Sequence, residues 1–367
     1  MISYQEDKPI ILREGDHNLS DLTALRNTKK IWKEVDVYKL QLRELFEITN
    51  PSLIFSSQFE TKKNEYIQKQ LDEQKNKFKG TWVYYPWSGN LVHTVNENDY
   101  SNLRTNRNKN LITEEEQKIL ASSCVGIVGL SVGSNVATTL TYGGIAKNLK
   151  LAEFDILETT NLNRVRGYLE QIGMNKIDLL SQQLYEINPF LNIYNFPEKI
   201  NKINLENFVA GNPKPRVIFE IIDSFEMKIH LRALAREHEI PVIMITNLGD
   251  RILMDVERYD LDKNIDFFNG RAGKVPKNIL EKPDITPQDK HKYAVDLAGV
   301  EHIPQKALGS VAEIGKTLVG RPQLASTVTI AGGLSSYLVR KIVLGQPLPS
   351  CSWLVDLDKI FIQETAL

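Results

Sequence analysis

Residues 124–134, with the sequence CVGIVGLSVGS, decide the fold. The apolar run over 124–130 predicts a buried strand, and the small residues over 134–145 predict a helix that packs closely on it. Gly129 and Gly133 stand between the two, where glycine permits a tight turn and lets a phosphate approach the backbone. The order strand, glycine-rich turn, helix indicates either a phosphate site or a turn that needs only backbone freedom.

This turn differs from the one found in nicotinamide-binding enzymes. The segment Gly129-Leu130-Ser131-Val132-Gly133-Ser134 lacks the middle glycine of G-x-G-x-x-G and is one residue shorter. A nucleotide other than NAD is therefore expected at this turn.

Strands alternate with helices along the rest of the chain. Apolar runs bounded by acids or turn residues predict strands over 149–155, 216–223, 241–247, 252–259 and 353–356, and amphipathic runs predict helices over 174–187, 225–238 and 325–344. This order is typical of an α/β fold, a Rossmann-like, mostly parallel sheet with flanking helices. The segment 267–292, rich in Gly, Pro, Lys and Asp, is predicted to be a mobile loop or lid.

The N-terminal part has a different pattern. Helical spacing of apolar residues covers 37–46, and Trp82, Tyr84, Tyr85 and Trp87 precede a turn and a second alternating run. We therefore predict a small α+β domain over residues 1–103, with a hairpin whose aromatic rings form a core. Residues 104–367 form the second predicted domain.

Composition excludes several classes of protein. The 367 residues are 42% hydrophobic, carry a formal net charge of −1 and contain two cysteines, Cys124 and Cys351. The balanced charge gives no field to attract nucleic acid, and no apolar stretch is long enough to span a membrane, so a cytoplasmic location is expected. Two cysteines cannot form a four-cysteine zinc site, so no zinc is expected, and both are predicted to be structural.

Acidic residues follow two of the predicted strands. Glu153 and Asp155 end the second strand, where an acid can bind ribose hydroxyls. Asp223 ends a later strand, at the edge where ligands of open α/β sheets collect, and could hold Mg²⁺ on a nucleotide's phosphates. As an alternative, Asp223 could simply cap the next helix.

Basic residues suited to phosphate follow the acids. Arg164 comes shortly after the predicted ribose site, and its guanidinium can bind phosphate oxygens in a bidentate manner. Lys176 stands near a helix N-terminus, which lysines usually avoid, and this indicates an anionic ligand. A surface salt bridge is the alternative for Arg164.

Taken together, these positions resemble the ThiF/MoeB/HesA family, which includes the adenylation domains of ubiquitin-activating enzymes. Its motifs correspond in order to Gly129–Gly133, Glu153-x-Asp155, Asn161-Leu162-x-Arg164, Gly173-x-x-Lys176 and Glu220-x-x-Asp223. The chain departs from the family in its shorter turn and in Glu153 and Glu220, each of which replaces an aspartate.

The resemblance implies ATP and Mg²⁺ as cofactors and assigns roles to residues. Nucleotide binding would fall to Gly129, Ser131, Gly133, Glu153, Asp155, Asn161, Arg164 and Lys176. Arg164, Lys176 and Asp223 would be catalytic, with Asp223 holding Mg²⁺. The segment Arg104-Thr105-Asn106-Arg107 is similar to one whose second arginine reaches the partner subunit's ATP site, so Arg107 would be catalytic and a homodimer is implied.

The reaction implied is adenylation of a carboxylate with release of pyrophosphate. Because no cysteine stands in residues 261–320, where thioester-forming relatives carry one, direct attack of a nucleophile on the adenylate is expected. A peptide or small-molecule carboxylate is favoured, as in relatives that modify ribosomal peptides of the microcin C7 and pantocin types, and the N-terminal domain would clamp the peptide. Alternatives are a tRNA threonylcarbamoyladenosine dehydratase-like enzyme, an NAD(P)- or FAD-dependent oxidoreductase and a nucleotide-binding scaffold.

Overall fold

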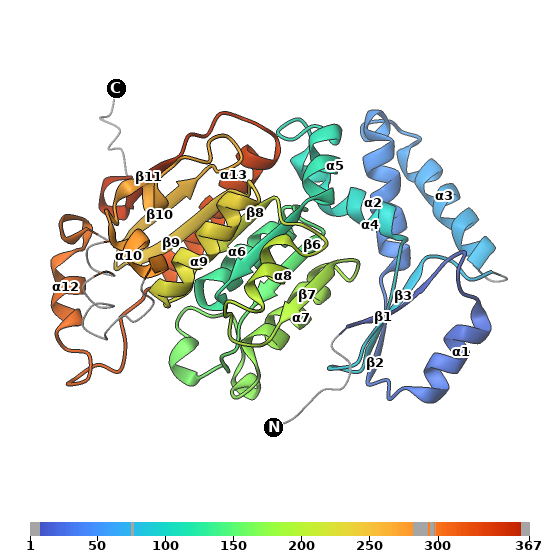
Figure 1. Ribbon diagram of the computed structural model, residues 1–367. Coiled ribbons are helices and arrows are strands. Elements are labelled where there is room, and N and C mark those ends of the chain that lie inside the picture. The colour runs from blue at the N-terminus through green and yellow to red at the C-terminus, as the bar shows by residue number, and fades with distance from the viewer. Residues whose placement is uncertain (1–7, 75–76, 282–292, 294–296, 298, 361–367) are drawn as a thin grey trace. The chain divides into compact units, whose positions relative to one another are not determined.

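A computed structural model describes residues 8–74, 77–281, 293, 297 and 299–360 (Figure 1). The chain divides into two compact units. Unit 1 consists of Met1–Gln117, Tyr142–Gly144 and Ser181–Leu191, and unit 2 consists of Lys118–Thr141, Ile145–Leu180 and Asn192–Leu367. The first unit thus extends beyond the boundary predicted at residues 103 and 104 and takes in two short later segments.

Unit 1 is an α+β structure. Its four strands have the order β1-β3-β4-β2, and they are β1 (Ile10–Arg13), β2 (Lys33–Asp36), β3 (Thr81–Tyr85) and β4 (Asn90–Thr94). The helices are α1 (Leu19–Thr28), α2 (Tyr38–Thr49), α3 (Phe59–Gln74), α4 (Glu97–Thr105) and the start of α5 (Glu114–Ser122). The helix predicted over 37–46 and the hairpin β3–β4 are confirmed, whereas β1 and β2 were not predicted.

Aromatic rings of the hairpin form part of the core of unit 1. Trp82, Tyr84 and Tyr85 are buried. The ring of His93 on β4 stacks on Trp82 with a centroid separation of 4.3 Å and on Tyr38 with one of 4.6 Å. The predicted role as core residues is therefore confirmed for Trp82, Tyr84 and Tyr85, whereas Trp87 is only partly buried and its indole N–H donates to Glu186 at 2.6 Å.

Unit 2 contains a seven-stranded sheet with the order β11-β10-β9-β8-β5-β6-β7. The strands are β5 (Cys124–Val128), β6 (Asn148–Ala152), β7 (Asn192–Phe196), β8 (Val217–Glu220), β9 (Val242–Leu248), β10 (Arg251–Glu257) and β11 (Cys351–Asp356). The five strands from β9 to β7 are parallel, and β10 and β11 extend the sheet antiparallel. The predicted Rossmann-like α/β fold is confirmed.

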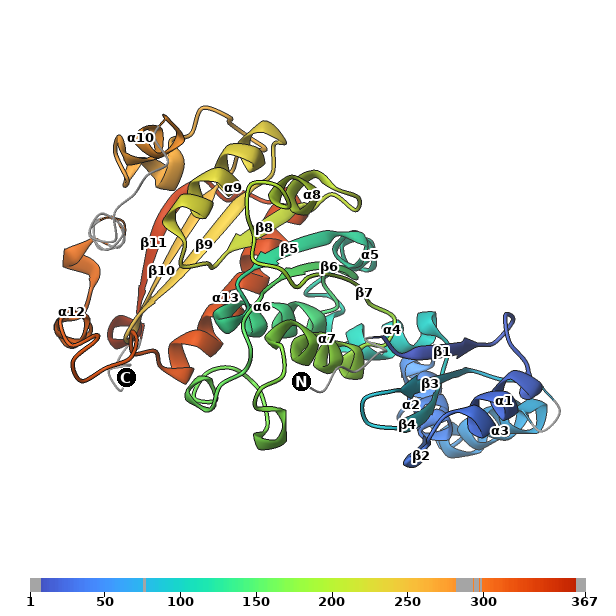
Figure 2. The ribbon, with the colours of Figure 1, turned by 60° about the horizontal axis from the view of Figure 1, so that its bottom comes forward.

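Helices cover both faces of this sheet, as Figure 2 shows. On one face lie α8 (Leu205–Ala210) and α9 (Phe225–Glu237), whose apolar residues pack with those of β8 and β9. On the other lie α6 (Leu130–Tyr142) and α13 (Ala325–Val343), which approach closely because Gly332 stands against Asn135. The remaining described helices are α7 (Lys176–Ile187), whose part from Ser181 onward belongs to unit 1, α10 (Val275–Glu281) and α12 (Gln305–Val311). None of the described helices has the length and hydropathy needed to cross a membrane.

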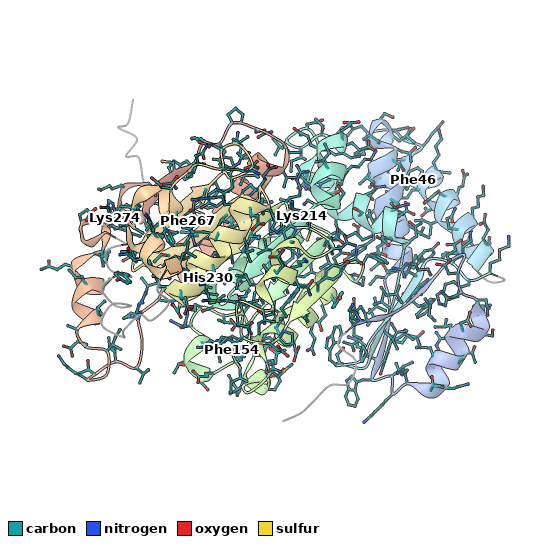
Figure 3. All side chains as sticks on the ribbon, in the orientation of Figure 1. Phe46, Phe154, Lys214, His230, Phe267 and Lys274 are labelled. Atoms are coloured by element: carbon teal, nitrogen blue, oxygen red, sulfur yellow. The ribbon has the colours of Figure 1, made fainter. Side chains whose placement is uncertain are left out.

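The first half of the predicted lid is packed rather than loose. Phe267 and Phe268 belong to a short 3₁₀ turn, Phe267–Gly270, and are buried in the core of unit 2 together with Ile279 of α10. Phe267, labelled in Figure 3, makes an edge contact with Tyr259 at 6.4 Å between ring centroids. The prediction of a mobile segment is wrong for 267–281, and residues 282–292 lie outside the described residues.

The turn after β5 is shaped by one glycine. Gly129 has φ +91°, and a Cβ atom added to it would lie 2.3 Å from the carbonyl oxygen of Ile221. Helix α6 begins directly afterwards at Leu130, so Ser131 and Gly133 belong to its first turn and not to an open loop. Gly133 lets α6 approach β5, since its added Cβ would meet Ile127 at 2.7 Å. The glycines therefore bring backbone segments together.

Replacing Gly129 by alanine should destabilise unit 2 through two effects, the positive φ and the collision with Ile221. Gly173 isolates the first effect, because it has the same φ of +91° with nothing within 4 Å of an added Cβ. We expect Gly173→Ala to cost about 1 kcal/mol of unfolding free energy and Gly129→Ala about 3 kcal/mol, measured by urea unfolding. Equal losses in the two variants would show that the approach to Ile221 imposes no constraint.

Candidate functional site

Two hollows meet at the carboxyl ends of β5, β6, β8 and β9. The smaller has a volume of about 240 Å³ and is lined by Gly129, Ser131, Glu153, Asp155 and Asp223, with apolar walls from Val128, Ala152, Ile200 and Met227. The larger, of about 460 Å³, is lined by Ser131, Arg164 and Asp223 together with residues of β9 and of the segment before α13. Ser131 and Asp223 line both, so the two hollows are adjacent.

The carboxylate of Glu153 is used in hydrogen bonds to backbone N–H groups. This carboxylate is buried and accepts hydrogen bonds from the N–H groups of Leu130 at 2.9 Å, Phe154 at 2.9 Å and Asp155 at 3.1 Å. It therefore occupies the positive end of α6 next to the turn, a position that would otherwise attract a ligand anion. Glu153 shapes the wall of the smaller hollow, and Asp155 is left as the exposed acid.

Asp155 and Lys176 form an ion pair beside the smaller hollow. The Nζ of Lys176 lies 3.2 Å from Oδ2 of Asp155, and the backbone N–H of Lys176 donates to the Asp155 carbonyl oxygen at 2.9 Å. The ammonium group is buried while the carboxylate is half exposed. Lys176 thus binds the carboxylate of Asp155. The side chain of Lys176 does not itself line either hollow.

Asp223 is exposed at the mouth of both hollows. The cap of α9 is not Asp223 but the next residue, since the hydroxyl of Ser224 accepts a hydrogen bond from the N–H of Met227. The alternative interpretation of Asp223 as a helix cap is therefore wrong. Its carboxylate remains available to a ligand.

Glu220 is fully buried and belongs to a cluster of charges. It contacts Nζ of Lys228 at 2.6 Å and the guanidinium of Arg232 at 2.7 Å, and Arg232 also contacts Glu257 at 2.7 Å. Burial by itself would raise the pKa of Glu220, but the charges of Lys228 and Arg232 bring this pKa below its ordinary value. Glu220 is thus an ionised structural residue and has no free oxygen for a metal.

Arg164 reaches the larger hollow from the loop after β6. Its Nε donates to the hydroxyl of Ser131 at 3.2 Å, and one terminal nitrogen donates to Asn163 at 2.9 Å and to the carbonyl oxygen of Thr160 at 3.3 Å. Partial burial lowers the pKa of Arg164, and the nearby charge of Asp223 opposes this shift. Among the described residues it makes no salt bridge, which removes that alternative interpretation.

Besides Lys176, three other predicted residues do not line the two hollows. Asn161 is buried, and its side-chain oxygen accepts from the N–H of Glu158 at 3.2 Å, which closes the turn Thr159–Asn161. Gly133 is buried against β5. Arg107 belongs to unit 1, in the turn Asn106–Asn108, with an exposed side chain. The role of Arg107 in a partner's site stays a prediction.

The structure also brings residues to the site that sequence reasoning missed. The larger hollow contains Lys228 of α9, Asn247 of β9, and Arg321 and Gln323 before α13. Lys228 could have been found, because it stands one helical turn after the cap of α9 and faces the same way as Ser224. Asn247 had one local signal, a polar residue at the end of an apolar strand.

Comparison with protein families and curated proteins gives clear matches. The model of the ThiF family matches residues 104–364. An uncharacterised protein of Mycobacterium tuberculosis (strain CDC 1551 / Oshkosh) is 32% identical over 353 residues, covering 95% of this chain and 45% of that protein. Ubiquitin-like modifier-activating enzyme 5 of Drosophila pseudoobscura pseudoobscura is 32% identical over 157 residues, covering 40% and 38%. The chain spans less than half the length of these relatives.

Solved structures with a similar fold have lower identity. PaaA superposes with a TM-score of 0.49 at 20% identity, over 71% of this chain and 77% of that one. The tRNA N6-threonylcarbamoyladenosine dehydratase TcdA of E. coli gives 0.47 at 19%, over 66% and 95%. Since the family model covers well over half of the chain, including the turn, Arg164 and Asp223, the chain belongs to the ThiF family.

Proposed function

We propose that this protein adenylates a substrate carboxylate with ATP and passes the acyl group directly to a nucleophile. The observation that carries the proposal is Asp223, an exposed carboxylate free of any capping role at the junction of the two hollows. Membership of the ThiF family supports a nucleotide at this junction. The smaller hollow would take the nucleoside, with Asp155 on the ribose, and the larger one the acyl substrate.

The reaction needs no nucleophilic side chain from the protein. An oxygen of the substrate carboxylate attacks the α-phosphorus of ATP, the bond from that phosphorus to the β-phosphate oxygen breaks, and pyrophosphate leaves. The resulting mixed anhydride is attacked at its acyl carbon by the nucleophile, with release of AMP. Arg164 offsets negative charge on the phosphates, and Lys176 positions Asp155 through their ion pair.

Asp223 is suited to Mg²⁺. Magnesium in nucleotide sites is usually held by one or two carboxylates and by phosphate oxygens. In the described part of the chain, no group of three His, Cys, Asp or Glu side chains could hold a metal ion by itself. When bound, the ion would neutralise the charge of the leaving pyrophosphate.

Removing the charge of Asp223 should abolish the first step. We expect Asp223→Asn to reduce ATP–pyrophosphate exchange at least about 100-fold, as loss of one key electrostatic group does in other enzymes. The assay is run on the whole chain with Mg²⁺ over a panel of short peptides and small carboxylates. Asp250→Asn is the matched control, because Asp250 is exposed and lines neither hollow. Exchange that survives in Asp223→Asn would contradict the assignment.

In the proposed direct transfer, neither of the two cysteines carries the acyl group. Cys124 is buried on β5, where burial raises the pKa of its thiol to about 11, so it is a poor nucleophile at neutral pH. Cys351 on β11 lines a separate, open hollow with Ser350 and Ser352. Neither thiol is at the junction marked by Asp223.

We therefore expect Cys351→Ala to keep both pyrophosphate exchange and acyl transfer to the nucleophile within about twofold of wild type. Hydroxylamine trapping and mass spectrometry of the product measure the second step. A variant that still exchanges pyrophosphate but no longer transfers the acyl group would point to an enzyme thioester at Cys351 instead.

A further inference from the structure

The larger hollow is lined by an arginine that has no partner of opposite charge. Arg321 stands in the segment before α13, and its side chain is exposed. In the described part of the chain, this side chain takes part in no hydrogen bond and no ion pair. An arginine on an open surface would need no explanation, but one that lines a hollow of about 460 Å³ can meet a ligand there.

The other charged residues that line this hollow are already accounted for. The ammonium group of Lys228 is 2.6 Å from the carboxylate of Glu220. The charges of Arg164 and Asp223 act on each other, and in the proposed reaction these two residues serve the phosphates and their magnesium ion. Within the described lining, Arg321 is therefore the charged residue to which the adenylation step assigns no anion.

A chain of hydrogen bonds ties the segment of Arg321 to the loop of Arg164. The Nδ2 of Asn163 donates to the carbonyl oxygen of Gln323 at 2.8 Å, and the Oδ1 of Asn163 accepts from Nη1 of Arg164 at 2.9 Å. Arg321 comes two residues before Gln323, so the Cα atoms of these two are at most about 7 Å apart. Two arginines thus line one hollow from separate segments that Asn163 joins.

The remaining walls and the chemistry of arginine define what would lie there. Apolar side chains line the hollow from several elements: Phe225, Ile245, Leu253, Leu297 and Ile314. A guanidinium binds a carboxylate through two parallel, charge-assisted hydrogen bonds, whereas a neutral acyl chain would leave its charge unpaired. We infer that the acyl substrate is a dicarboxylate, in which a short apolar linker separates the carboxylate that is adenylated from a second one, and that Arg321 binds the second. The inference rests on the proposed adenylation and adds this second charged group to its substrate.

Matched mimics of the acyl-adenylate test it, with a sulfamate in place of the phosphate of AMP. One pair carries a succinyl or a succinamoyl group and the other a glutaryl or a glutaramoyl group, so within each pair a carboxamide replaces the second carboxylate. We expect the wild-type chain to bind the carboxylate member of at least one pair about tenfold or more tightly by calorimetry, because hydrogen bonds between charged groups are the stronger ones. Arg321→Gln should bind both members alike, and Arg321→Lys should restore part of the preference.

The outcomes separate the inference from the proposed function. Equal binding within both pairs by the wild-type chain, with all four mimics bound more tightly than AMP, would overturn the inference and leave adenylation standing. Binding of every mimic no tighter than that of AMP would overturn the proposed function as well.

The affinity for ATP distinguishes a second carboxylate from the phosphates as the anion at Arg321. We expect Arg321→Gln to bind ATP with Mg²⁺ within about twofold of wild type, which also shows that the variant is folded. Lys316→Gln is the matched control, because Lys316 is an exposed cation of the same segment that lines neither hollow, and this variant should keep the preference for the carboxylate mimic. A loss of ATP affinity of about tenfold or more in Arg321→Gln would assign Arg321 to the phosphates and overturn the inference.

Discussion

The close approach of Gly129 to the carbonyl oxygen of Ile221 is the contact on which the site depends. A side chain at residue 129 would collide with that oxygen, and the N–H of Ile221 donates to Val128 at 2.8 Å just beside it. The turn that opens α6 and the segment that leaves β8 are thereby held together. Ser131 and Asp223 follow these two segments, which is why they share both hollows. The phosphates of a nucleotide would lie across this junction.

The acids of the site divide into structural and exposed ones. Glu153 and Glu220, which replace aspartates of the family pattern, are both buried and bonded, one to backbone N–H groups and the other to Lys228 and Arg232. The longer glutamate side chain reaches these internal partners. Asp155 and Asp223 remain exposed to a ligand. The two glutamates that depart from the family pattern are thus buried structural residues, of which Glu153 lines the smaller hollow.

The sequence was most informative where a pattern is local. The apolar run over 124–130 and the alternation after it predict the parallel sheet, and the order of Arg164, Lys176 and Asp223 predicts the family. Strand β2, with the sequence KEVD, has no apolar alternation and exists through pairing with β4, so it could not be predicted. Asn247 was missed for a similar reason. Its place in the lining depends on residues of distant elements that form the larger hollow.

The most direct measurement follows an oxygen atom. A carboxylate that supports pyrophosphate exchange is labelled with ¹⁸O and turned over with ATP and the nucleophile, and the AMP is examined by ³¹P NMR. Attack of the carboxylate on the α-phosphorus transfers one labelled oxygen to AMP, so the account predicts AMP whose phosphorus resonance has the isotope shift of a single ¹⁸O. Unlabelled AMP, or ADP and phosphate as the products, would contradict adenylation at the junction of Ser131 and Asp223.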